Sequence, residues 1–477
     1  MRLLVIIMVL FGLEFPSKAQ INTNLGVNSS IAAGANNIIQ VGVQRSFIGA
    51  GDGNTNAANN SIVGAGYNNG VFSAPRSGIV AGSTNKILTG AANCFIGAGS
   101  LNLIEAGSTN SFIGAGYRNL IDFNSIHSFI GAGYGNVITT SSNNFCSVIG
   151  GGERNVISMT LGTISGGLIN RVSGLCGTVA GGYANLSAGD SSTVGGGTSN
   201  DAAGNYSVIA GGAGNDATNW YTTVGGGFAN SAYGYSATIA GGFVNTNSGL
   251  YGALAGGCSN RVTGDWATVS GGMSNVAVAR NATIPGGSRN TAGNNGSFVW
   301  GDGSSATASW ADNTFTVRAI GGTRFYTAAG TATGVRLAAG GTAWASLSDR
   351  ASKQDFQPVD KREILKKVAD LPVTSWTYKT DLSRRYIGPM AQDFHSTFGL
   401  GDDDKSITTL DTDGVMYAAI QGLVEELKER DQMMALQRLE NASALVQRDG
   451  EIESLKKDIR ELKNRIDSML PPSTVKK

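Results

Sequence analysis

Apolar residues recur at a nearly fixed spacing through the first 300 residues of this chain. Each unit holds an apolar residue, two small residues, a glycine, two variable residues and an asparagine, as in Val269 to Asn275. The apolar position, called the anchor below, occurs eighteen times: Ile31, Ile48, Val63, Ile79, Ile96, Ile113, Ile130, Ile149, Ile164, Val179, Val194, Ile209, Val224, Ile239, Leu254, Val269, Ile284 and Val299. From Ile149 onward each anchor follows the previous one by 15 residues, whereas earlier spacings vary between 15 and 19. A fixed period of this length predicts a solenoid.

Each unit is long enough for one turn of a β-roll, with two short strands and two tight bends. A threonine often precedes the anchor, and β-branched residues suit pleated, half-buried strands. One turn buries almost nothing alone, so the core forms by stacking. We therefore predict a mostly β rod of about 18 turns over residues 20–310, roughly 85 Å long at ~4.8 Å per turn.

The glycine and the asparagine of the unit both have structural explanations. The glycine occurs in seventeen units, from Gly34 to Gly287, and permits positive φ and close backbone approach. The asparagine also occurs in seventeen, from Asn37 to Asn290. Asparagine tolerates left-handed backbone and bonds to its own backbone in turns, and stacked asparagines can form an amide ladder.

Charge divides the chain into two kinds of structure. Residues 20–310 carry 18 charged residues, whereas residues 348–477 carry 44, and the net charge of the whole chain is +1. That balance gives no global field for nucleic acid or an anionic membrane. We expect a β-rich neck at 311–347, a domain core at 348–415 and a helical coiled coil and tail at 416–477.

Residues 1–19 are typical of a secretory signal peptide. Arg2 precedes the apolar run Leu3 to Phe11, and Ser17-Lys18-Ala19 offers small residues for cleavage. An uncleaved anchor is the alternative. We expect a secreted or cell-surface protein with no other membrane insertion.

The four cysteines, Cys94, Cys146, Cys176 and Cys258, lie far apart in the repeats without metal-ligand spacing. Cys146 and Cys176 share a register but are two turns apart, roughly 9–10 Å and beyond disulfide reach. We predict free thiols, no metal site and no cofactor.

The end of the chain has a heptad pattern. Ile452, Leu455, Ile459 and Leu462 alternate at three and four residues among charged positions, which predicts a coiled coil. Pro471-Pro472 ends it. The pattern alone does not fix the number of strands.

The segment Leu347-Ser348-Asp349-Arg350-Ala351-Ser352-Lys353 carries the candidate chemistry. A serine hydroxyl is a weak nucleophile that needs a nearby base, and a lysine can serve in its uncharged form, which burial or nearby positive charge favours. Ser348 and Lys353 can meet across a turn. The alternative is a solvated basic stretch after a strand. Asp349 could orient either group or cap the next segment.

The repeats resemble the left-handed β-roll heads of trimeric autotransporter adhesins, in the period near fifteen and in cores such as Ile149-Gly150-Gly151-Gly152. That resemblance implies three chains in one rod and an adhesive surface. The membrane barrel that ends such adhesins has no counterpart in the charged C-terminal sequence. The N-terminal turns carry insertions and aromatic residues, which favours a glycan or matrix ligand there. Structural irregularity near the N-terminal cap is the alternative. These aromatics are Phe47, Tyr67, Phe72, Phe95, Phe112, Phe129 and Tyr134.

The C-terminal part resembles the intramolecular chaperone of phage endosialidase tail spikes, a self-processing serine peptidase family. The resemblance covers about 348–430. It rests on Ser348-Asp349-x-x-x-Lys353, on Gly388-Pro389-Met390-Ala391-Gln392 and on Ala419-Ile420-Gln421-x-Leu423. It implies a homotrimer, a nucleophile at Ser348, a base at Lys353 and cleavage of the Leu347–Ser348 bond.

The leading hypothesis is thus a secreted trimeric fibre whose chaperone drives folding and then releases itself. One alternative is a fibre whose C-terminal domain only trimerises. Another is a glycan-degrading tail spike, which needs paired carboxylates in one cleft. The acids of the rod, such as Asp52, Glu105, Asp122, Glu153 and Asp190, are scattered along the sequence.

Overall fold

The computed structural model describes residues 21–139, 145–331 and 333–469. The expected signal peptide at 1–19 and Pro471-Pro472 lie outside the described residues. The chain forms two compact units, one ending at Gly321 and one beginning at Gly322, and each is described by itself.

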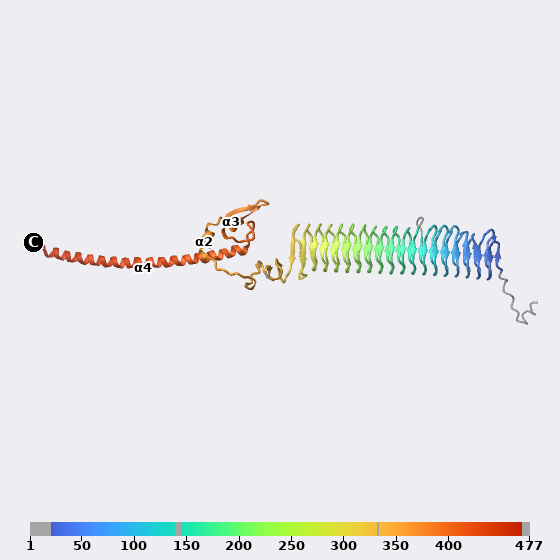
Figure 1. Ribbon diagram of the computed structural model, residues 1–477, viewed down its shortest axis with the longest axis horizontal. Coiled ribbons are helices and arrows are strands. Elements are labelled where there is room, and N and C mark those ends of the chain that lie inside the picture. The colour runs from blue at the N-terminus through green and yellow to red at the C-terminus, as the bar shows by residue number, and fades with distance from the viewer. Residues whose placement is uncertain (1–20, 140–144, 332, 470–477) are drawn as a thin grey trace, which may run out of the picture. The chain divides into compact units, whose positions relative to one another are not determined.

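The first unit is a parallel β-solenoid with two strands in each turn (Figure 1). Odd-numbered strands, from β1 (Thr23–Asn24) to β37 (Thr307–Ala308), form a 19-stranded sheet. Even-numbered strands, from β2 (Ser30–Ile31) to β38 (Phe315–Arg318), pair in the same order. The β-rich fold prediction is confirmed. The solenoid is one turn longer than expected, because β38 pairs in parallel with β36 (Phe298–Gly301) and so belongs to the rod rather than to the neck.

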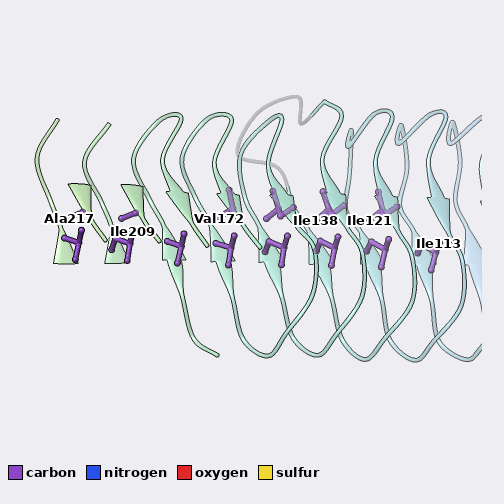
Figure 2. Close-up of a cluster of buried hydrophobic side chains, with 14 of the residues drawn as sticks. Ile113, Ile121, Ile138, Val172, Ile209 and Ala217 are labelled. Atoms are coloured by element: carbon purple, nitrogen blue, oxygen red, sulfur yellow. The ribbon is translucent and has the colours of Figure 1, made fainter. Parts of the chain in front are cut away.

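The anchors line one side of the core. Seventeen of the eighteen are at most 1% exposed, and Ile31, in the first even-numbered strand, is partly buried. Residues of the odd strands face them, as Figure 2 shows for Ile121, Ile138, Val172 and Ala217. In the 15-residue turns these facing residues are mostly small, so the anchors supply most of the apolar volume there.

Stacked asparagines form the predicted amide ladder along the rod. Asn155 is representative: its backbone N–H and its Nδ2 both donate to Oδ1 of Asn136, at 3.0 and 3.1 Å. Its Nδ2 also donates to the carbonyl oxygens of Gly151 and Gly167, both at 2.9 Å. All seventeen side chains are at most 1% exposed, so these bonds satisfy polar groups that water cannot reach.

The left-handed conformation falls on a different residue from the one expected. In most turns the residue before the asparagine has positive φ, for example Arg154 at 52° and Val244 at 55°, and the ladder asparagines do not. The ladder, and not backbone conformation, therefore explains why asparagine recurs.

The unit glycine has both properties expected of it. Gly152 has φ +88°, and a Cβ there would lie 2.1 Å from the carbonyl oxygen of Gly167 in the next turn. A larger residue would push neighbouring turns apart.

The ladder ends at Asn290. Thr307 lies opposite Asn290 in the next strand and is held by Nε of Arg318 at 3.0 Å. The Oδ1 atom of Asn290 is buried without a hydrogen-bond partner. The last turn is joined to the rod by other side-chain bonds, such as the one that the backbone N–H of Asn295 donates to the carboxylate of Asp312 at 2.9 Å.

The second unit begins with an antiparallel sheet of β39 (Thr323–Tyr326), β40 (Gly334–Leu337) and β41 (Trp344–Ser346). The short helix η1 (Arg350–Ser352), α2 (Lys361–Asp370), the hairpin of β42 (Thr374–Tyr378) and β43 (Asp381–Gly388), and α3 (Ala391–Phe398) follow. The long helix α4 (Thr409–Met469) ends the described chain, beginning earlier than its expected start near 415.

Helices α2 and α4 pack closely. A Cβ on Gly422 would lie 2.4 Å from the carbonyl oxygen of Lys361, so glycine permits this approach. Lys361 pairs with Glu425 at 2.9 Å, and Arg362 pairs with Glu429.

Beyond this contact the heptad positions of α4 are exposed. Leu455, Ile459 and Leu462 are 60%, 62% and 56% exposed. Among the described helices, none is long and apolar enough to cross a membrane.

We predict that Asn215→Ala destabilises the rod by about 3 kcal/mol, because Asn230 loses its acceptor and two carbonyl oxygens lose their donor. Asn290→Ala is the matched control at the ladder end and should cost about half as much, since no residue donates to its Oδ1. Urea unfolding followed by circular dichroism measures both. Equal losses would contradict the ladder's role.

Candidate active site

The candidate nucleophile, Ser348, lies two residues after the end of strand β41. That strand ends at Ser346, and the backbone N–H of Leu347 donates to the carbonyl oxygen of Gly334 at 2.9 Å. Leu347 is half-buried and Ser348 is exposed. The Leu347–Ser348 peptide therefore lies where a fixed strand gives way to an accessible turn.

Asp349 caps the turn that follows. Its carboxylate accepts from the backbone N–H of Ala351 at 3.0 Å, and its carbonyl oxygen accepts from the hydroxyl of Ser352 at 2.8 Å. Of the two roles considered for Asp349, the geometry is that of a cap.

This turn brings the two candidate catalytic groups together. Nζ of Lys353 donates to Oγ of Ser348 at 2.5 Å. Both side chains are exposed in the single chain. A lysine–serine contact of this kind is the geometry in which an uncharged amine can accept the hydroxyl proton.

A surface hollow of about 510 Å³ lies beside Ser348. Its lining includes Thr331, Arg336, Ser346 and Leu347. Arg336 was not among the candidate residues of the sequence, and it reaches this place because β40 pairs Arg336 with Ala345 of β41. Only the strand register could have indicated it.

Two cations near Lys353 in the sequence, Arg350 and Lys361, have other partners. Arg350 lies over the ring of Phe356, 5.0 Å from its centroid. Lys361 is paired with Glu425 on α4. Arg336 is thus the cation that shares the hollow with Ser348.

The carboxylates of the rod are less scattered than their sequence positions indicate. Glu105 and Asp122 follow paired strands of neighbouring turns and interact, and burial together with Asp122 raises the pKa of Glu105. Asp201 lies directly opposite Asp216, and burial followed by the Asp216 charge raises the pKa of Asp201. The members of each pair are neighbours along one sheet and do not face each other across a cleft.

The four cysteines are free thiols, as predicted. Cys94 is buried, which raises the pKa of its thiol to about 11. Cys146 and Cys176 are exposed.

Residues 348–399 match the family model described as the chaperone of endosialidase. The chain contains a chaperone-of-endosialidase domain. This match begins at Ser348, the residue that contacts Lys353. None of the curated proteins matches the chain. The chaperone domain and the β-solenoid before it together fit a fibre of the tail-spike kind.

We predict that Cys146 and Cys176 react with a thiol reagent at pH 8 in the folded protein, and that Cys94 does not. The Cys94 thiol has a pKa of about 11 and so forms little thiolate. Mass spectrometry after brief iodoacetamide treatment measures this, with the urea-unfolded protein as control. Equal labelling of Cys94 in the folded protein would contradict its burial.

Proposed function

We propose that this protein is a secreted trimeric fibre whose C-terminal chaperone drives trimerisation and folding and then releases itself by cutting the Leu347–Ser348 bond. The observation that carries the proposal is the contact between Lys353 and Ser348 at the first residue of the matched domain. Secretion rests on the signal-like sequence of residues 1–19.

Three-chain assembly is supported by α4. Its heptad residues Ile452, Leu455 and Ile459 are exposed in the single chain, at 43%, 60% and 62%. Apolar residues in this spacing are stabilised by packing against other helices. The choice of three chains follows from the chaperone family.

The cleavage step uses atoms that are already close. Uncharged Nζ of Lys353 removes the Ser348 hydroxyl proton, and Oγ attacks the carbonyl carbon of Leu347 through a five-membered ring. The C–N bond breaks, the amine of Ser348 takes the proton back, and the Leu347 acyl group is left on Oγ as an ester. Water hydrolyses this ester to a Leu347 carboxylate and a free Ser348 hydroxyl.

Assembly is expected to activate the base. Lys353 is exposed in the single chain, and the uncharged form of an amine is favoured by removal from water or by nearby positive charge. Neighbouring chains would remove Lys353 from water, and Arg336 beside the hollow would supply the positive charge. Cleavage would then follow trimerisation.

We predict that the wild type yields two products ending at Leu347 and beginning at Ser348, and that Ser348→Ala remains a single chain. Loss of the nucleophile should slow cleavage at least about 10³-fold. Lys353→Arg keeps the charge but removes the base and should slow it about 10²- to 10⁴-fold. A denaturing gel with intact-mass spectrometry measures the products.

Ser352→Ala is the matched control, because Ser352 lies in the same turn and bonds to the Asp349 carbonyl oxygen. It should cleave normally. Cleavage that persists in Ser348→Ala would contradict the proposed nucleophile. A wild type that is trimeric by light scattering yet uncut would support the alternative, a fibre whose C-terminal domain only assembles it.

We also propose that the N-terminal turns bind a surface glycan or matrix molecule. Support comes from one bend of the rod, where Tyr117 and Tyr134 stack at 5.5 Å. Arg118 and Arg154 lie over these two rings, at 5.2 and 5.6 Å from the centroids. Exposed aromatic rings beside cations suit ligands with both apolar and acidic groups.

We predict that replacing both Tyr117 and Tyr134 by serine weakens binding to a glycan array or to matrix proteins at least about tenfold, equivalent to about 1.4 kcal/mol. Tyr183→Ser, at the same position of a later turn, is the control. Equal loss in both would contradict a site on the N-terminal turns.

A further inference from the structure

The outside of the even-strand sheet differs from every other surface of the rod. We call it the even face and define it by three positions in each turn, one before the anchor and the two after it. The residue before the anchor points outward, because strand residues alternate and the anchor points inward. These outward residues are Ser30, Phe47, Ile62, Gly78, Phe95, Phe112, Phe129, Val148, Thr163, Thr178, Thr193, Val208, Thr223, Thr238, Ala253, Thr268, Thr283 and Phe298.

The even face of the eighteen anchored turns carries no charge. Across all eighteen anchors, each within the described residues, none of the three positions holds Asp, Glu, Lys or Arg. The charged residues of these turns lie instead on the odd-strand sheet, as Lys86, Arg171 and Asp216 do, or in the bends. Arg318, in the strand β38 that follows the last anchor, is an exception at the end of the rod. A solvated surface of this length would be expected to carry charge, whereas a protein contact depletes it.

The even face is also flat enough for close approach. After the anchor come residues such as Ala180-Gly181 and Gly195-Gly196, with little or no side chain. Towards the N-terminus the face becomes aromatic. Phe95, Phe112 and Phe129 stack along it at 5.5 and 5.3 Å between ring centroids.

From Phe47 to Val148 the outward residues form an apolar row with one interruption. Gly78 stands between Ile62 and Phe95, and a hollow of about 260 Å³ lies there. Its lining includes Ile62, Val80 and Phe95, so it can receive an apolar side chain from another molecule.

The length of the face identifies its occupant. A partner that covers it must be uncharged, straight and built with the same rise per turn, and a second copy of this chain meets all three conditions. Eighteen turns at ~4.8 Å by roughly 10 Å of width give about 850 Å². A stable interface buries about 800 Å² per partner.

We propose that the even face is the surface through which copies of this chain pack along the rod, with the three even faces turned towards a common axis. This inference rests on the proposed trimer and adds the surface that forms it. The interface then includes Phe47, Phe95, Phe112 and Phe129. A ligand of the N-terminal turns would bind at the bends. Displacing one chain by one turn relative to its neighbours would weaken this contact, because Gly78 and the phenylalanines would no longer lie against the positions that fit them.

Cysteine cross-linking of the full-length protein tests this proposal. The four native cysteines are first replaced by serine. Thr193→Cys and Thr223→Cys then place single thiols on the even face. Ser231→Cys and Thr246→Cys are matched controls on the odd-strand sheet of nearby turns. Each variant is treated with a short bis-maleimide and run on a denaturing gel, with circular dichroism to show equal folding and light scattering to give the mass before treatment.

We expect at least fivefold more cross-linked dimer from the even-face thiols than from the controls. A trimeric mass together with cross-linking that is equal at the two sets of thiols, or greater at the controls on the odd-strand sheet, would contradict the even face as the interface while leaving the proposed trimer intact. A monomeric mass would overturn both the trimer and this inference.

Discussion

The rod depends on the hydrogen bonds between stacked asparagine side chains. Each ladder asparagine bonds to the turn before it and to the turn after it, at a position where water does not reach. The glycine of each turn is part of the same contact, because only a residue without Cβ lets the next carbonyl oxygen come near enough to accept from the amide. A turn built in this way has its polar groups satisfied only between two neighbours, which is why a single repeat cannot be stable alone.

These hydrogen bonds hold each turn against the next within one chain. Because they are alike in every turn, they do not set which turn of one chain lies beside which turn of a neighbouring chain. From Ile149 to Val299 the turns have equal length and nearly equal cores, so a neighbouring chain could lie one turn out of place and keep most of its contacts. The N-terminal turns differ in length and in their outward residues, and there a displaced chain would fit badly. A chaperone domain that aligns three chains in register would therefore matter most for the regular part of the rod.

Much of the rod could be predicted from the sequence, because a period of 15 and an inward anchor leave few alternatives to a solenoid. The ladder was predicted, but the left-handed position was assigned to the asparagine when it belongs to the residue before it, since both fit the same motif. The spacing of Ser348 and Lys353 allowed their contact, and the resemblance to the chaperone family implied it. Arg336 and the Glu105–Asp122 pair could not be found in this way, because they depend on the register of strands that are distant in sequence.

The end of the asparagine ladder at Asn290 has a mechanical consequence. In the layer after it a threonine takes the place of the next asparagine, and side-chain bonds are made in the bend instead, where Ser309 and Asp312 accept from the backbone of the turn before. A fibre pulled along its axis would thus pass its load through the buried ladder at the other layers and through bonds nearer the solvent at this one.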